Sequence, residues 1–137
     1  MSETVEFELV SPERLLKSEP VEMVVVPGAE GNLGILPGHS LLIATMRPGV
    51  IDVHKDSKVV EQIFISGGFA EVSPERCTVL AEEAIPVGEI DKEEAQIRLK
   101  NAKEVLNSSK SNNQNDTAVA DKEVRTAEAM ILAIPKT

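Results

Sequence analysis

The chain has 137 residues, with 14 basic and 23 acidic side chains and a formal net charge of −9. That length suits one ordinary domain or a small domain with an appendage, and the acidic balance argues against general nucleic-acid binding. One Cys and two His exclude an internal disulfide framework and a zinc site made of His and Cys alone. We expect a soluble protein of a reducing compartment, because no apolar run is long enough to span a membrane and no secretory signal opens the sequence.

Residues 1–88 have the pattern of an all-β unit. Val5, Phe7 and Leu9 alternate with glutamates, which predicts a strand with one buried face. Further β-rich runs are separated by Pro, Gly, Asp and Ser, and they occupy residues 21–26, 41–46, 50–54, 59–66, 69–72 and 78–84. This spacing predicts a β-sandwich, a flattened barrel of about ten short strands. An open sheet with covering helices is disfavoured, since no helical pattern precedes residue 89.

Residues 89–137 predict a C-terminal antiparallel α-helical hairpin. Asp91 is placed to cap the first helix, and either Asp116 or Thr117 the second. The polar segment 107–115 predicts the loop between them. Two stripes at helical spacing supply the apolar faces: Ala95, Leu99, Ala102 and Leu106, then Ala120, Val124, Ala127 and Ile131. Half of these positions are Ala, so the hairpin buries little apolar area and should need another surface to rest on.

A glycine-rich segment, residues 26–39, carries Gly28, Gly31 and Gly34 at three-residue spacing. It is not a phosphate-binding P-loop, because the Gly-Lys-Ser/Thr sequence opening a helix is missing. We interpret it as a compact loop with positive φ at several positions. Such a rigid loop, with exposed Glu30 and Asn32, is suited to docking a partner.

No catalytic or metal-binding residue is assigned. His39 has no carboxylate or Cys at ligand spacing, and His54 alternates with Val53 on a predicted strand and should face solvent. Cys77 precedes an apolar run, which predicts a buried, inert thiol. A small hydrolase would need a nucleophile, a base and an orienting group, and the sequence does not provide that set.

Four sequence blocks carry a family resemblance: GNLGILPGH at 31–39, RPGV at 47–50, SGGFAEV at 66–72 and VLAEEA at 79–84. Together they resemble the epsilon subunit of F-type ATP synthase, a family that includes the mitochondrial subunit called delta. The resemblance implies a β-sandwich followed by a helical hairpin. It also implies a non-catalytic rotor subunit of the central stalk, which couples rotation of the c-subunit ring to ATP synthesis.

The resemblance further implies the partners and the location. The gamma subunit and the c-ring are the expected partners, and the hairpin is the element that reaches the alpha/beta catalytic head in some members. We expect partner contacts at Glu30, Gly31, Asn32 and His39, although Asn32 stands where the family's G-E-L-G pattern has an acid. Association with a membrane is expected only through the complex, at the cytoplasmic face of the bacterial inner membrane. A plastid-encoded thylakoid version also fits.

A nucleotide motif of some members, I/L-D-x-x-R-A, is matched here only in part. Ile90, Asp91 and Ala95 agree with it, but Glu94 replaces the Arg. A carboxylate repels a triphosphate, so we expect no bound ATP and no other cofactor. The alternative function is a nucleotide-sensing or inhibitory regulatory module, in which the hairpin controls ATP hydrolysis.

Overall fold

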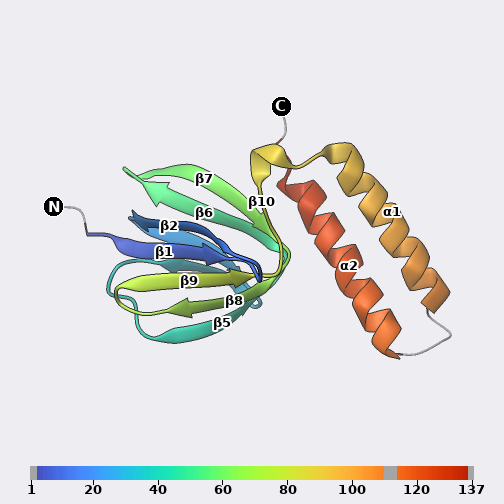
Figure 1. The fold of residues 1–137 in the computed structure, drawn as a ribbon, viewed down its shortest axis with the longest axis horizontal. Helices are drawn as coiled ribbons and strands as arrows, with labels where there is room; N and C mark the ends of the chain where they lie inside the picture. The colour runs from blue at the N-terminus through green and yellow to red at the C-terminus, as the bar shows by residue number, and fades with distance from the viewer. Residues whose placement is uncertain (1–2, 110–113, 136–137) are drawn as a thin grey trace. The chain divides into compact units, whose positions relative to one another are not determined.

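The computed structural model describes residues 3–109 and 114–135, which form two compact units. The first unit ends at Pro86 and the second begins at Val87. Figure 1 shows the first as β structure and the second as a pair of helices. The predicted sandwich followed by a helical hairpin is thus confirmed.

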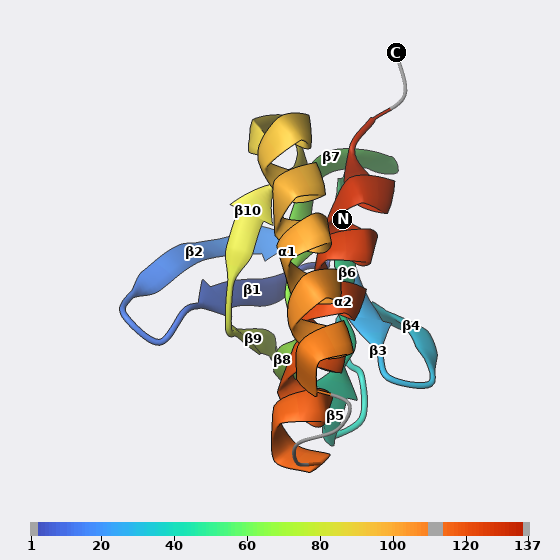
Figure 2. The same ribbon diagram turned by 90° about the vertical axis from the view of Figure 1, so that its right-hand side faces the viewer.

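The first unit is a single curled sheet of ten strands (Figures 1 and 2). The strands are β1 (Val5–Val10), β2 (Leu15–Val21), β3 (Met23–Gly28), β4 (Gly31–Ile35), β5 (Leu42–Met46), β6 (Gly49–Lys55), β7 (Lys58–Ile65), β8 (Gly68–Val72), β9 (Arg76–Ala81) and β10 (Ala84–Pro86). Their order is β10-β7-β6-β3-β5-β8-β9-β1-β2, with β4 paired to β3 outside this path. Only the β1–β9 pair is parallel among the pairs described.

Alternation along the strands builds the core. In β1 the apolar residues Val5, Phe7 and Leu9 are buried, as the sequence predicts. Buried apolar side chains of the other strands join them in a single core cluster, whose buried members all lie between Val5 and Ala81 in the sequence. Burying this much apolar surface is the main stabilising contribution to the first unit.

Two strands were not expected from the sequence. Residues 15–21 form β2, although Lys17, Ser18 and Glu19 interrupt the apolar alternation. The glycine-rich segment is only partly a loop, because Gly31–Ile35 forms β4 and pairs with β3 in a hairpin. The run 78–84 also divides, into β9 and the separate short strand β10.

The second unit contains a 3₁₀ turn (Val87–Glu89) and two helices, α1 (Lys92–Ser109) and α2 (Gln114–Ala133). Asp91 caps α1, since its Oδ1 accepts hydrogen bonds from the amides of Glu93 and Glu94 at 2.9 and 3.2 Å. The expected cap at Asp116 or Thr117 is wrong, because α2 already begins at Gln114. The expected loop is shorter than predicted; its residues 110–113 lie outside the described residues.

The helical stripes are placed as predicted. Ala95, Ala102, Ala120 and Ala127 are buried, and the two helices pack against each other. An ion pair joins them, with Arg98 Nε 2.6 Å from Glu123 Oε1. Of the helices in the described ranges, none combines the length and apolarity needed to cross a membrane.

Candidate partner-binding site

The β3–β4 hairpin presents the first group of predicted site residues. Gly28 pairs with Gly31, so Ala29 and Glu30 form a two-residue turn at its tip. Gly31 has a φ of +149°, a conformation that favours glycine. Glu30, Gly31 and Asn32 are all exposed. Figure 2 shows the hairpin as a light-blue arm that extends beyond its neighbouring strands.

Arg47, just after β5, holds this hairpin at three points. Its backbone N donates to Pro27 O at 2.9 Å. Its Nη1 donates to Gly28 O, and its Nη2 donates to Asn32 Oδ1 at 2.7 Å. The amide of Ala29 adds a fourth link by donating to Thr45 O at 2.8 Å. The tip is therefore tied to the segment that joins β5 to β6.

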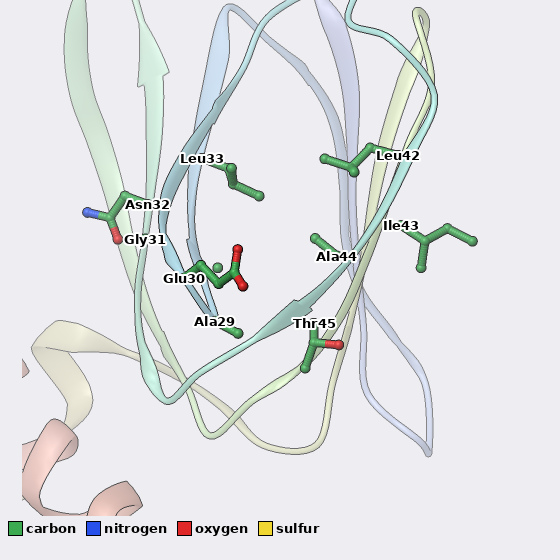
Figure 3. Close-up of a pocket in the computed structure, with 10 residues that line it drawn as sticks. Ala29, Glu30, Gly31, Asn32, Leu33, Leu42, Ile43, Ala44 and Thr45 are labelled. Carbon is green, nitrogen blue, oxygen red and sulfur yellow. The ribbon is translucent and has the colours of Figure 1, made fainter.

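A groove of about 520 Å³ lies between the hairpin and β5. Figure 3 shows Leu33 and Leu42 pointing toward each other across it, with Glu30 at its edge. Leu42 lies in register with the buried Val72, yet it is 36% exposed. The groove is thus an opening in the sheet where core-facing side chains remain accessible. Asn32 and Ile43 point away from it (Figure 3).

A second apolar surface crosses the outer face of the sheet. Register places Val10, Leu80, Phe69 and Thr45 side by side on β1, β9, β8 and β5; we call this row the outer strip. Phe69 is 54% exposed and Leu80 is 47% exposed. Large apolar side chains that are adjacent and exposed indicate a protein-binding surface.

Acidic residues border the outer strip. The next row across the same strands contains Glu8, Thr78, Glu71 and Ile43. Glu8 accepts a hydrogen bond from Thr78 at 3.1 Å and pairs with Arg76 at 3.3 Å, whereas Glu71 is exposed. The surface therefore combines an apolar centre with an exposed carboxylate, Glu71, at its margin, which suits a partner with a basic residue at its rim.

His39 lies apart from the other predicted site residues. It belongs to the segment between β4 and β5, and the amide of the preceding Gly38 donates to Pro74 O at 2.7 Å. That turn is beside the Leu42 end of β5, whereas the hairpin tip contacts the Met46 end. The two ends are separated by roughly 13 Å of strand. The structure thus brings Glu30, Gly31 and Asn32 together and leaves His39 outside this group.

The described residues contain no set of His, Cys, Asp and Glu side chains arranged to hold a metal ion. His39 Nδ1 lies 2.8 Å from Ser40 O, and His54 is half-buried in β6 rather than fully facing solvent. Burial raises the pKa of the Cys77 thiol to about 12. Such a thiol is protonated at neutral pH and is a poor nucleophile, as expected.

The helical unit has its own hollow of about 480 Å³, lined by both helices. Apolar Ile97, Val105 and Val119 form much of its wall. Near the start of α1, the carboxylate of Asp91 is already engaged in capping, and Glu94 adds a negative charge. The partial nucleotide motif therefore has a structural role as a helix cap.

Sequence reasoning missed Arg47 and the outer strip. In the sequence, Arg47 stands out only as the first residue of a family block. Its hydrogen-bond partners, Asn32 and Gly28, are 15 and 19 residues away, so no local pattern predicts them. The strip becomes visible only when the register aligns Phe69 with both Thr45 and Leu80. Alternation alone would have placed Phe69 on the face opposite Ala70, but it could not show which residues flank it.

Comparisons with known proteins agree with this architecture. The family described as "ATP synthase, Delta/Epsilon chain, beta-sandwich domain" matches residues 4–87. The ATP synthase epsilon chain of Paramagnetospirillum magneticum is 55% identical, with 98% of this chain and 99% of that chain covered. The epsilon chain of Rhodospirillum rubrum is 50% identical, with coverage of 97% and 98%.

A solved structure gives the same result at lower identity. A cryo-EM structure of the Euglena gracilis mitochondrial ATP synthase contains a chain that superposes with a TM-score of 0.79. The two are 26% identical over 96% of this chain and 82% of that chain. The chain therefore belongs to the delta/epsilon chain family of ATP synthase.

Proposed function

We propose that this non-catalytic central-stalk subunit couples c-ring rotation to ATP synthesis by binding the gamma subunit and the c-ring with its sandwich. The outer strip carries the proposal, because its apolar residues Val10, Leu80 and Phe69 are adjacent across three strands and the side chains of Phe69 and Leu80 are exposed. A rotor subunit must transmit torque through stable adhesion, and an apolar centre with a charged margin provides it. The solved Euglena assembly, described as OSCP/F1/c-ring, supports the c-ring as a partner.

We assign the outer strip to gamma and the exposed hairpin tip to the c-ring. The tip offers Glu30 on an exposed two-residue turn. A negative side chain on such a turn favours a basic partner loop. In this arrangement the chain lies at the cytoplasmic face of the bacterial inner membrane and is attached only through the complex.

The strip is tested by Phe69→Glu in the full-length chain. A charge at the centre of an apolar interface should weaken binding to purified gamma by at least about tenfold. Val60→Glu is the matched control, because Val60 is 52% exposed on β7 and lies outside the strip. Equal gamma binding by both variants, with unchanged melting temperatures, would contradict the assignment of this surface.

The hairpin tip is tested by Glu30→Gln in complexes that retain gamma. Neutralising the carboxylate should weaken association with the c-ring and reduce its dependence on salt concentration. The control is Glu13→Gln, an exposed glutamate in the β1–β2 turn. If ring assembly and its salt dependence stay the same in Glu30→Gln, the tip does not contact the ring through this charge.

For the helical unit, we propose that it does not sense ATP. Asp91 is engaged as a cap, Glu94 is acidic, and Arg98 pairs with Glu123. A ligand that binds only the native state raises the melting temperature. Millimolar ATP should therefore leave the melting temperature of the full chain unchanged, and a rise would favour the nucleotide-sensing alternative.

A further inference from the structure

We infer that Arg47 is a positioning residue, which fixes the β3–β4 hairpin tip in the shape that the partner recognises. This inference rests on the proposed function of the tip as a docking surface. Arg47 is the one side chain outside the hairpin for which hydrogen bonds to both arms are found in the described structure: to Gly28 O on β3 and to Asn32 Oδ1 on β4. We call this pair of bonds the clasp.

The clasp depends on the shape of the guanidinium group. Its two terminal nitrogens bind separate acceptors on the two arms of the hairpin: Gly28 O, directly before the Ala29–Glu30 turn, and Asn32 Oδ1, two residues after it. A planar group with several fixed donors can bridge two acceptors, whereas a lysine ammonium is a single point donor on a flexible stem. Lysine at this position would keep the charge and lose the bridge.

Asn32 lines the groove, and its side-chain oxygen is engaged in the clasp. Figure 3 shows its side chain pointing away from the groove, and its Oδ1 is 2.7 Å from Arg47 Nη2. The two acceptors that the Arg47 side chain binds, Gly28 O and Asn32 Oδ1, are both neutral. The clasp therefore depends on hydrogen-bond geometry and not on an ion pair. Asn32 therefore supports the tip, and Glu30 remains its exposed charged residue.

Backbone packing explains why the clasp can fix the tip. Arg47 N donates to Pro27 O, and a Cβ added at Gly49 would lie only 2.8 Å from the Pro27 Cβ. The base of the hairpin is thus in close contact with the segment that carries Arg47. Because the backbone of Arg47 is already fixed, its side chain loses less conformational entropy when it forms these hydrogen bonds. The bonds can therefore hold the turn more effectively.

The experiment compares four variants of the full chain: Arg47→Lys, Asn32→Leu, their combination, and Asn32→Asp. Binding is measured to the host ATP synthase stripped of its own copy of this chain. Arg47→Lys and Asn32→Leu should each weaken binding by about tenfold. The combination should be no weaker than the worse single variant, because both changes open the same clasp. Asn32→Asp should bind like the native chain, since a carboxylate accepts the same bond.

A second measurement reads the clasp without a partner. Hydrogen exchange of the Ala29 amide, which donates to Thr45 O, should be several-fold faster in Arg47→Lys and Asn32→Leu and unchanged in Asn32→Asp. Arg125→Lys is the matched control, because Arg125 is an exposed arginine of α2 that pairs with Asp121. It should alter neither measurement.

Three results would overturn the inference. Native-like binding by Arg47→Lys would show that only the charge matters. Additive losses in the combination would show that Arg47 and Asn32 contact the partner independently. Unchanged Ala29 exchange in both single variants would show that the clasp does not hold the turn. If instead the native chain fails to bind while Ala29 exchange responds as expected, the proposed function fails and the clasp stands.

Discussion

Gly68 is the position where a side chain is least compatible with the backbone. It begins β8 with a φ of +140°, and an added Cβ would lie 1.9 Å from Leu80 O. Gly68 pairs with Met46 on β5 and with Ala81 on β9, and these strands also carry residues of the outer strip. A change at Gly68 therefore affects both the backbone conformation and the pairing of three strands.

We predict that Gly68→Ala lowers the free energy of unfolding by about 2–4 kcal/mol, because the methyl group clashes with backbone and the φ is unfavourable. The measurement is equilibrium urea unfolding of the full chain. Gly88→Ala is the control, since an added Cβ there meets no atom within 4 Å. It should change the free energy by less than about 1 kcal/mol. Equal effects of the two substitutions would show that the strand pairing tolerates a side chain at Gly68.

At the scale of elements, charged side chains join β2 to β6 and β7, near the two ends of the strand order. Lys17 Nζ lies 2.8 Å from Glu61 Oε1, and Lys55 Nζ lies 2.9 Å from Glu19 Oε2. Lys17 also pairs with Glu19 at 3.5 Å. We call this group the ion-pair seam. Backbone pairing connects β2 only to β1 among the described strands, so the seam helps to close the curled sheet.

The seam predicts a specific pH dependence. The hydrogen bond from Lys55 lowers the pKa of Glu19 from its ordinary value of 4.5, so folding favours the charged carboxylate. The stabilisation that the Glu19 carboxylate gives to the fold is fully present above about pH 4.5 and is lost as the pH falls through the lowered pKa. The hydrogen bond from Lys17 to Glu61 raises the pKa of Lys17 above 10.5, so the contribution from the charged Lys17 is lost as the pH rises through the raised value.

Glu19→Gln should therefore cost about 0.5–1 kcal/mol at pH 7, since the pair is partly exposed and screened. The difference from the native chain should disappear as the pH falls through the lowered pKa. Urea unfolding at a series of pH values between 7 and 3 measures it, and Glu13→Gln in the exposed β1–β2 turn is the control. A difference that persists at pH 3 would mean that Glu19 stabilises the fold by packing and not by charge.

Sequence patterns predicted those elements whose apolar residues repeat regularly. Val5, Phe7 and Leu9 specified β1, and the Ala-rich stripes specified both helices. β2 was missed because its lysine and glutamate side chains serve the ion-pair seam, a contact between distant segments. β4 was missed because glycines usually mark a loop, whereas here they form a hairpin beside β3. At the candidate site, Glu30 and Asn32 could be chosen locally, but Arg47 reaches Asn32 only because β3 and β5 pair at Gly28 and Met46.

At the scale of the whole molecule, the two units differ in how they are stabilised. The apolar cluster of the first unit includes Phe7, Ile35, Ile51 and Ile65, all fully buried, and its buried members lie between Val5 and Ala81 in the sequence. The buried residues of the helices are mostly Ala, which contribute much less apolar area per residue. The sandwich therefore has a core of its own, and the helical pair gains less from packing.

We predict that a fragment of residues 1–88 folds without the helices and binds gamma with nearly the affinity of the full chain. The core cluster and the outer strip lie entirely within it, so the fragment retains both its stability and its proposed docking surface. A fragment of residues 87–137 should be only partly helical in isolation, because helices with little apolar contact are marginal in water. Circular dichroism with urea unfolding measures both fragments, and co-purification measures gamma binding. A sandwich fragment without a cooperative transition, or one that folds and does not bind gamma, would show that the helices supply structure or contacts that the sandwich lacks.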